Sequence, residues 1–346
     1  MSSVSAAPTS PAPMPGVARP AIRVVTVAYH CGEGIRGLLQ SLPEASHQAI
    51  HTVVVDNSEN CDTAVAALCQ EFGAEYRSLP DNPGFGAGNN FGSDFGGSEP
   101  WLLFANPDLR LTPGAVDTLI AAAESHPAAA IIGPALVDET GTRYPTGRSF
   151  PYISIGIGHA LLGRVWPGNP WTRRYWGSSW RGTDAVEVDW VSGACILIRR
   201  SDWEQLGGFD PAYFMYFEDV DLAWRARRFL GRGALFVGSA VAIHEQGATT
   251  GNKTSGAGQK RNLRVLQAHH DSARIFLDRL YVNQPYALPL LMLISWGLRL
   301  RYRVLARHEG RYAAPRTEPA LESARSSASA RRCCNATAPA RSPTPL

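Results

Sequence analysis

The 346-residue chain lacks most features that would assign it to a specialised class of protein. Its six cysteines form no Cys-x-x-Cys pair, which excludes a zinc ribbon or a thioredoxin-type redox site. They are also too few and too scattered for a disulfide scaffold, so we expect free thiols. Charge of one sign is not in excess: 33 basic and 30 acidic residues leave a net charge of +3, so nucleic acid is not an expected partner.

A secretory signal and a long apolar segment are missing as well. Residues 1–20 are rich in Ser, Ala and Pro, with neither a basic start nor an apolar core. The apolar run over 287–298 has 12 residues. As a helix it would measure about 18 Å against a hydrocarbon core of about 30 Å. We therefore expect a cytoplasmic protein with a disordered arm over 1–20 and a disordered tail over 310–346.

What the chain does contain is an alternation of short β-branched runs with helical stretches. The strand-like runs are 23–28, 52–55, 101–105 and 130–132, and the helical stretches between them are 34–41, 63–71 and 113–125. This alternation predicts an α/β fold with a mostly parallel central sheet covered on both faces. Ligands of such sheets bind beyond the carboxyl ends of the strands, where Asp56 and Asp108 lie.

A glycine-rich segment, NPGFGAGNN, occupies residues 82–90. A G-x-G-x-x-G match would require glycine where the chain has Asn89, and the segment does not follow the first strand. A dinucleotide fingerprint is therefore excluded. Two interpretations stay open: a glycine-rich turn before a helix, or a loop whose backbone approaches a nucleotide closely.

Single polar residues near strand ends allow both a structural and a chemical interpretation. Asp56 is either a turn former or an acceptor for a base or ribose. Asp108 either forms an Asx turn or holds a divalent cation against a diphosphate, because Mg²⁺ needs only one or two carboxylates beside substrate phosphates. His244 is either structural or a neutral nitrogen ligand. After His244, four basic residues form either a solvated surface or a flexible lid that neutralises phosphate: Lys253, Lys260, Arg261 and Arg264.

An acidic cluster follows a mostly aromatic run, YFMYF, at residues 213–217. Acids at a helix start complement the helix dipole, and Asp221 has Arg225 at i+4 as an ion-pair partner. Glu218 and Asp219 have no such neighbour. Two adjacent carboxylates behind aromatic residues indicate a site wall where a pKa can be raised.

Assembled in order, these motifs resemble glycosyltransferase family 2, the inverting nucleotide-sugar enzymes of GT-A fold. The motifs are NPGFGAGNN, FANPD, DWVSGACILIRR, GGFD and YFMYFEDVDLAWRARR, followed by a histidine. The resemblance covers residues 22–282 and is greatest to bacterial rhamnosyltransferases that use dTDP-L-rhamnose. It implies a Rossmann-like nucleotide-sugar-binding half over 21–135, a fused acceptor-binding and catalytic half over 136–285, and C-terminal helices.

The resemblance also implies roles for individual residues. Asp219 is expected to be the catalytic base, with Glu218 as its rival. The nucleotide-sugar-binding residues would be Thr26, Ala28, Tyr29, Asp56, Asn82, Gly84, Phe85, Asn89, Asn106 and Asp108. The acceptor-binding residues would be Trp190, Gly193 and Glu218, and the phosphate-binding residues Lys260, Arg261 and Arg264. Asn106 replaces the first acid of the family's D-x-D motif, so Asp108 would carry Mg²⁺ or Mn²⁺, with His244 as a late ligand.

The implied activity is transfer of L-rhamnose from dTDP-L-rhamnose onto a polyprenyl-diphosphate-linked N-acetylglucosamine in cell-wall or polysaccharide assembly. A galactofuranosyl or other hexosyl transferase using a UDP-sugar is the alternative within the family. A nucleotidylyltransferase is disfavoured because residues 28–33 lack the usual Arg/Lys-bearing glycine loop. A nucleotide-sugar sensor or scaffold is disfavoured by the intact acids.

The segment 286–309 carries the expectation of a membrane contact. Its apolar run is followed by four arginines, a pattern typical of a helix lying on an anionic leaflet. We expect peripheral association with the inner face of the cell membrane. Packing of this helix on the protein, or in a homodimer, is the alternative.

Overall fold

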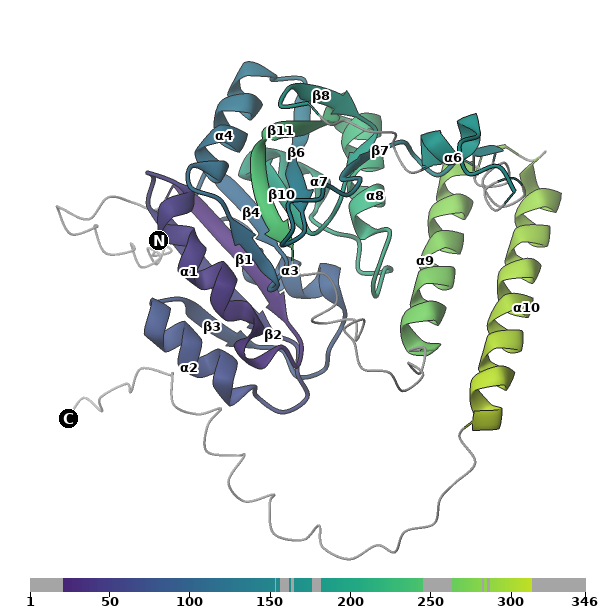
Figure 1. The fold of residues 1–346 in the computed structure, drawn as a ribbon, viewed down its shortest axis with the longest axis horizontal. Coiled ribbons are helices and arrows are strands. Elements are labelled where there is room, and N and C mark those ends of the chain that lie inside the picture. Colours follow the sequence, from purple (N-terminus) through teal and green to yellow (C-terminus); the bar gives the residue numbers. More distant parts are fainter. Residues whose placement is uncertain are drawn as a thin grey trace, which may run out of the picture.

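The computed structural model describes residues 21–152, 154–155, 162, 165–175, 182–244, 263–281, 283–284 and 287–312. Its centre is one nine-stranded sheet of order β3-β2-β1-β4-β10-β6-β11-β5, with β8 paired to β11 (Figure 1). The α/β prediction is confirmed.

The first part of the chain builds a parallel block. Its strands are β1 (Ile22–Ala28), β2 (Ile50–Asp56), β3 (Glu75–Ser78) and β4 (Trp101–Ala105), and every pairing within the block is parallel. The connecting helices are η1 (Gly32–Ile35), α1 (Arg36–Ala45), α2 (Thr63–Phe72) and α3 (Phe85–Ser93). All seven residues of β1 are buried, which explains why five of them are apolar.

The second part of the chain completes the same sheet. Its strands are β5 (Leu109–Leu111), β6 (Ala129–Val137), β8 (Ala185–Val188), β10 (Cys195–Arg199) and β11 (Gly233–His244). Strand β10 lies between β4 and β6 and is antiparallel to both, whereas β11 is parallel to β6. The sheet is therefore mixed, with its antiparallel pairs concentrated in this part. A small second sheet pairs β7 (Gly147–Arg148) with β9 (Trp190–Val191).

The later helices cover both faces of the sheet, and the last two extend away from it (Figure 1). They are α4 (Ala115–Ser125), α6 (Pro170–Tyr175), α7 (Arg200–Leu206), α8 (Glu218–Arg225), the π-helical turn η2 (Ala226–Leu230), α9 (Leu263–Tyr281) and α10 (Leu288–Tyr312). Among the helices in the described ranges, none combines the length and apolar character needed to cross a bilayer. Helix α10 runs three residues into the expected tail, and residues 1–20 and 313–346 lie outside the described residues.

A buried ionic network lies where β1 and β4 begin. Glu99 accepts hydrogen bonds from Arg23 at 3.0 Å and Arg200 at 3.0 Å, and contacts His51 at 2.9 Å. Burial alone would raise the pKa of Glu99, but the hydrogen bonds from His51 and Arg23 lower it to about 2. This network stabilises the edge of the sheet at which β1 and β4 begin.

Candidate active site

The carboxyl edge of the sheet is organised by the three-residue turn Ser192–Ala194, which joins β9 to β10. The Gly193 N–H donates to Asp219 Oδ2 at 2.7 Å, and the Ala194 carbonyl accepts from the Asn106 N–H at 2.8 Å. Because β10 pairs with β4 in the register Cys195 to Ala105, the turn lies beside the segment that follows β4. One turn therefore brings the FANPD motif and the acidic cluster together.

Glu218 and Asp219 begin helix α8 after Phe217, whose backbone has a φ of 66°. Glu218 is 6% exposed, and its Oε2 has no hydrogen-bond partner among the described residues. Asp219 is half-buried and accepts at Oδ1 from the Val220 N–H at 2.8 Å. The two neighbouring carboxyls thus have very different surroundings.

The surroundings decide which carboxyl of the pair keeps the proton. Burial raises the pKa of Glu218 well above its usual value, and the charge of Asp219 raises it further. Burial also raises the pKa of Asp219, but the N–H groups of Gly193 and Val220 and the charge of Arg148 act in the opposite direction. The pair titrates as a unit, and its first negative charge belongs on Asp219.

Asp221, the third acid of the cluster, is fully buried and has a structural role. It accepts from Arg225 Nε at 2.6 Å, from Arg279 of α9, and from the Tyr213 hydroxyl at 3.3 Å. The ion pair predicted from the i+4 spacing is confirmed. This carboxylate fixes α8 to α9 and to the segment before it.

Asp108 and His244 meet where β4 and β11 end. Asp108 Oδ1 lies 3.1 Å from His244 Nε2, and His244 Nδ1 contacts the Tyr144 hydroxyl. Two adjacent ligands of one octahedral Mg²⁺, each about 2.1 Å from the ion, lie about 3 Å apart, so this spacing fits a shared cation. Across the described ranges no cluster of three or more His, Cys, Asp or Glu is arranged to hold a metal. The other ligands would have to come from a substrate or from water.

The residues of β1 and β2 that were predicted to bind the nucleotide-sugar are mostly buried. Thr26 and Ala28 are fully buried, as is Asp56. The Asp56 carboxylate accepts from the Ser58 N–H at 2.9 Å, the Asp62 N–H at 2.8 Å and the Tyr76 hydroxyl at 2.6 Å. Asp56 therefore holds the loop between β2 and α2, whatever else it contacts.

The glycine-rich loop approaches the acid-bearing segment rather than standing free. Gly84 has a φ of 108°, and a Cβ there would lie 2.1 Å from the Phe214 carbonyl oxygen. The Phe85 N–H donates to that same oxygen at 3.0 Å. Asn89 is buried in α3, and its side-chain amide donates to the Phe85 carbonyl at 3.0 Å. Only glycine at position 84 allows this contact, which joins the donor-side loop to the acidic cluster.

Tyr29, Asn82 and Arg264 lie near one another. Tyr29 is half-buried and donates to Glu59 Oε1 at 3.1 Å. Burial and Glu59 raise the pKa of Tyr29, while the charge of Arg264 and the Asn82 side chain oppose them. The Arg264 guanidinium also lies 4.9 Å from the Phe214 ring centre. Of the predicted phosphate-binding residues, Lys260 and Arg261 lie outside the described residues.

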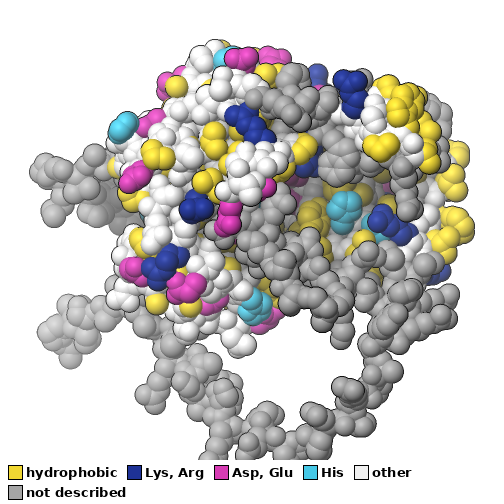
Figure 2. All heavy atoms as spheres, viewed as in Figure 1, with side chains coloured by type: hydrophobic (Ala, Val, Ile, Leu, Met, Phe, Trp, Pro, Cys, Tyr) yellow, Lys and Arg dark blue, Asp and Glu magenta, His cyan; other side chains and the backbone are white. Residues whose placement is uncertain are grey.

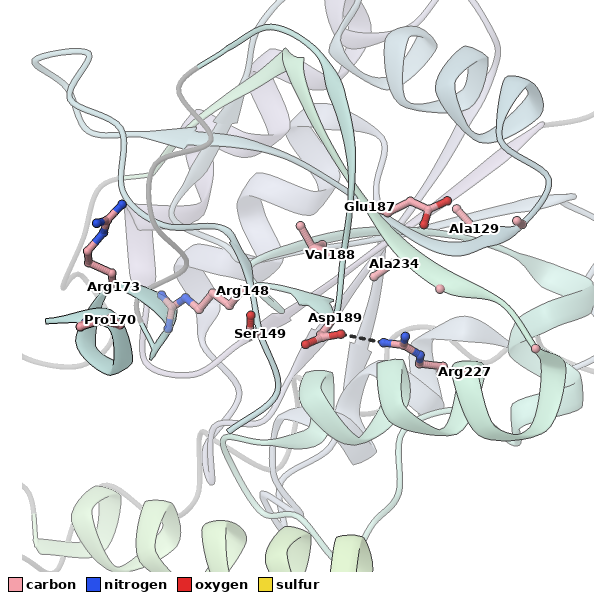
Figure 3. Close-up of a pocket in the computed structure, with 13 residues that line it drawn as sticks. Ala129, Arg148, Ser149, Pro170, Arg173, Glu187, Val188, Asp189, Arg227 and Ala234 are labelled. Atoms are coloured by element: carbon pink, nitrogen blue, oxygen red, sulfur yellow. Dashed lines mark hydrogen bonds and ion pairs between the residues drawn. The ribbon is translucent and has the colours of Figure 1, made fainter. Parts of the chain in front are cut away.

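Trp190, predicted for the acceptor, belongs to the small second sheet. Its Nε1 donates to the Ser149 carbonyl at 2.9 Å, and the Arg148 guanidinium lies 5.2 Å from its ring centre. Arg148 also lines a cavity of about 730 Å³ (Figure 3). Other lining residues are Ser149, Arg173, Glu187, Asp189, Arg227 and Gly233. Because Gly233 starts β11 and His244 ends it, this cavity lies away from the Asp108–His244 pair.

Three residues that act on members of the candidate site were not identified from the sequence. Tyr144 contacts His244, Arg148 acts on Asp219, and Arg279 holds Asp221. Tyr144 and Arg148 lie in the irregular stretch after β6, where no periodicity marks them. Arg279 lies in α9, and its position along that helix does not show which acid it meets.

A mixed α/β sheet with acids and a histidine gathered beyond its strand ends is the arrangement of GT-A glycosyltransferases. The Glycosyl transferase family 2 model matches residues 23–221. The N-acetylglucosaminyl-diphospho-decaprenol L-rhamnosyltransferase of Mycobacterium tuberculosis H37Rv is 35% identical over 298 residues, covering 82% of this chain and 92% of that protein. The chain therefore belongs to glycosyl transferase family 2.

Two further comparisons concern another relative and a solved structure. The rhamnosyltransferase WbbL of Escherichia coli K12 is 29% identical over 294 residues, covering 83% of this chain and 93% of that protein. Among solved structures, GalNAc-T7 with UDP, GalNAc and Mn²⁺ superposes with a TM-score of 0.53 at 12% identity, covering 82% of this chain and 54% of that one. The structural likeness concerns the fold.

Proposed function

We propose that this chain is an inverting rhamnosyltransferase that moves L-rhamnose from dTDP-L-rhamnose onto a polyprenyl-diphosphate-linked N-acetylglucosamine in cell-wall or polysaccharide assembly. Two relatives named as rhamnosyltransferases, each spanning more than 80% of the chain, support the donor and acceptor classes. The observation that carries the transferase chemistry is the adjacent Glu218–Asp219 pair: Glu218 is buried, and the half-buried Asp219 accepts from the Gly193 and Val220 N–H groups.

Asp219 is proposed as the general base. A sugar hydroxyl is a poor nucleophile, so a carboxylate takes its proton as it attacks the anomeric carbon. The bond from that carbon to the nucleoside diphosphate breaks on the opposite face. A β-linked dTDP-L-rhamnose therefore yields an α-L-rhamnosyl product. Because burial raises the pKa of Glu218, that side chain favours its protonated form and keeps a second negative charge away from the attacking oxygen.

Asp108 and His244 are proposed to hold Mg²⁺ or Mn²⁺ with oxygens of the donor diphosphate. The 3.1 Å spacing of their ligand atoms supports this role. A bound cation would stabilise the charge that develops on the leaving diphosphate. Tyr144 orients the His244 ring from the other nitrogen.

The metal proposal has a direct binding test. We expect Asp108→Ala to weaken Mn²⁺ binding, followed by the spin-resonance signal of the free ion, and to cripple turnover. The control is Glu71→Gln, because Glu71 lies far from the pair in the fold and its ion pair with Arg36 is exposed at the surface. Full activity of the wild type in excess EDTA would exclude an obligatory cation.

The remaining predicted residues divide into two groups. On the donor side, we propose that four residues contact the nucleotide or its phosphates: Tyr29, Asn82, Phe85 and Arg264. Four buried residues support them: Thr26, Ala28, Asp56 and Asn89. On the acceptor side, Trp190 and Gly193 are proposed to border the sugar. A lipid-linked acceptor also supports a position on the cytoplasmic face of the cell membrane, reached through residues 286–309.

A donor panel tests the function as a whole. The purified chain is incubated with a membrane extract and dTDP-L-rhamnose, UDP-galactofuranose or UDP-N-acetylglucosamine, and the extracted lipid is weighed by mass spectrometry. We expect an added deoxyhexose with the first donor only. A hexose added from a UDP-sugar would favour the alternative transferase. Nucleotide binding without transfer to any lipid would support a sensor.

A further inference from the structure

Helix α9 has two opposite contact faces. One face holds the segment that carries the acid pair: Ser272 Oγ donates to the Met215 carbonyl at 2.9 Å, and Arg279 donates to Asp221. The other face, marked by His270 and residues at helical spacing around it, is turned toward α10. A ligand held on that second face would lie about one helix diameter, roughly 10 Å, from the acid-bearing segment.

The second face of α9 and helix α10 enclose a cavity of about 300 Å³ with a basic lining. The lining residues are Gln267, His270, Asp271, Arg274, Ser295, Leu298, Arg299, Tyr302 and Arg303. Three guanidinium groups thus share the cavity with one carboxylate, Asp271. Within the part of the chain that the structure describes, none of the three arginines forms an ion pair. Their positive charge is left for an anionic ligand.

His270 gives a second, independent sign of a ligand. It is only 6% exposed, lines the cavity, and neither ring nitrogen has a partner among the described residues. Burial lowers the pKa of His270, and the charge of Arg301 lowers it further, so the ring is neutral and carries one N–H donor. A buried donor without a partner costs stability, and an oxygen atom in the cavity would remove that cost.

Beside the cavity, α10 presents an apolar stripe to solvent. Its exposed residues are Leu288, Met292, Leu293, Trp296 and Leu300, whose spacing keeps them on one side of the helix. Another side of α10 is buried on α9 through Leu291, together with Ala287 just before the helix. Figure 2 shows hydrophobic side chains gathered along the margin occupied by α10, with basic side chains beside them. Apolar and basic surfaces side by side match the interface of an anionic bilayer.

We propose that the cavity between α9 and α10 binds the phosphate of an anionic bilayer phospholipid, while the apolar stripe of α10 enters the interface. The proposal deepens the membrane contact given above and rests on it. Arg274, Arg299 and Arg303 bind the phosphate oxygens, and His270 donates one further hydrogen bond. Since α9 also holds the acid-bearing segment, this contact sets the height of Asp219 above the bilayer.

The test is co-sedimentation of the full chain with vesicles of phosphatidylcholine, alone or with phosphatidylglycerol. We expect binding to require phosphatidylglycerol, and Arg274→Gln to weaken it at least tenfold. Arg228→Gln, which removes an exposed charge from η2, is the matched control and should bind within twofold of the wild type. Ser295→Leu keeps the charge but fills the cavity, so it should also weaken binding at least tenfold.

Two outcomes would overturn the proposal. One is equal binding of Ser295→Leu and wild type, which would mean that diffuse charge suffices. The other is wild-type binding only to vesicles doped with a polyprenyl diphosphate, which would assign the cavity to the acceptor. Thermal melts and turnover of a short-chain acceptor in detergent verify that each variant is folded. Absence of turnover in the wild type would count against the proposed function and leave the vesicle result interpretable.

Discussion

Two buried carboxylate sites lie at opposite edges of the same sheet, and they are built on opposite plans. At the amino-terminal edge, Glu99 is surrounded by Arg23, Arg200 and His51, and its pKa is lowered to about 2. At the carboxyl edge, Glu218 and Asp219 share one negative charge, and burial raises both pKa values. The first plan stabilises the fold. The second leaves a carboxylate of raised pKa at the place where we propose that a proton is taken up.

The largest expected effect comes from removing basicity at the carboxyl edge. Asp219→Asn keeps the shape of the side chain, so we expect kcat to fall about 10²- to 10⁴-fold, or roughly 3 to 5 kcal/mol of barrier, with donor Kd little changed. Asp221→Asn, on the same helix, is the control: it should melt earlier and keep kcat within a few-fold. Near-normal kcat in folded Asp219→Asn, with collapse in Glu218→Gln, would transfer the role to Glu218.

Substitution of Glu99 is expected to change the stability of the fold and not the rate of catalysis. Glu99→Gln leaves Arg23 and Arg200 without their counter-charge, so we expect a loss of about 3 to 5 kcal/mol in the free energy of unfolding at pH 7. The folded pKa of about 2 lies below an unfolded value of about 4.3, so wild type loses this stabilisation as pH falls from about 4.3 toward 2.

Urea melts at pH 7 and pH 3 check this expectation. The difference between wild type and Glu99→Gln should shrink at pH 3, because Glu99 is then largely protonated in the unfolded wild type while the folded chain still holds it ionised. Glu71→Gln, which removes an exposed partner of Arg36, should cost less than about 1 kcal/mol at either pH. A pH-independent difference for Glu99→Gln would show that packing, and not charge, is lost.

A smaller effect is expected from crowding the base without changing its charge. A Cβ at Gly193 would lie 3.1 Å from Asp219 Oδ2, so Gly193→Ala must shift the carboxylate by a few tenths of an ångström. We expect kcat to fall about tenfold or less, with the melting temperature nearly unchanged. Gly233→Ala, where a Cβ meets nothing within 4 Å, is the matched control. Equal kcat in both variants would remove Gly193 from the positioning of the base.

The smallest expected effect is a gain in stability when Glu218 is replaced, because its Oε2 has no hydrogen-bond partner among the described residues. The raised pKa of Glu218 means that the folded chain binds a proton more tightly than the unfolded chain does. Stability therefore falls as pH rises from the unfolded pKa, about 4.3, toward the folded value. Glu218→Gln removes this loss, so its melting temperature should exceed that of the wild type by a margin that widens from pH 4 to pH 8. A constant margin would contradict the assignment of the proton.

The sequence predicted the elements whose pattern is strong and missed those made by tertiary contacts. Strands β1, β2 and β4 and helices α2 and α4 follow from apolar periodicity and lie where they were expected. Helix α3 contains three glycines, which lower helix propensity. A Cβ at Gly92 would lie 2.4 Å from a methyl of Val25, so packing on the sheet requires a residue that propensity disfavours. Edge strand β3 has no β-branched run to mark it.

The candidate site divides in the same way. The Asp221–Arg225 pair is local, four residues apart, and was predictable. The proximity of Asp108 and His244 spans 136 residues and depends on which strands become neighbours. The contact of Gly84 with Phe214 likewise depends on two loops that no sequence period relates. A family resemblance could name these residues, but only the three-dimensional fold brings them into contact.

The placement of β10 has a consequence for how the chain is made. This strand lies between β4 and β6, although it follows both of them in the chain. When synthesis has reached the end of β6, β4 and β6 cannot yet take their final places, because β10 must pair between them. The segment between β6 and β10 must close as a loop, and its entropy is lost before the pairing stabilises the chain. The turn that aligns Asp219 with Asn106 forms only when β10 pairs. A nascent chain that ends before α8 lacks the acidic cluster, so under the proposed function it has no activity until β10 has paired and α8 has folded.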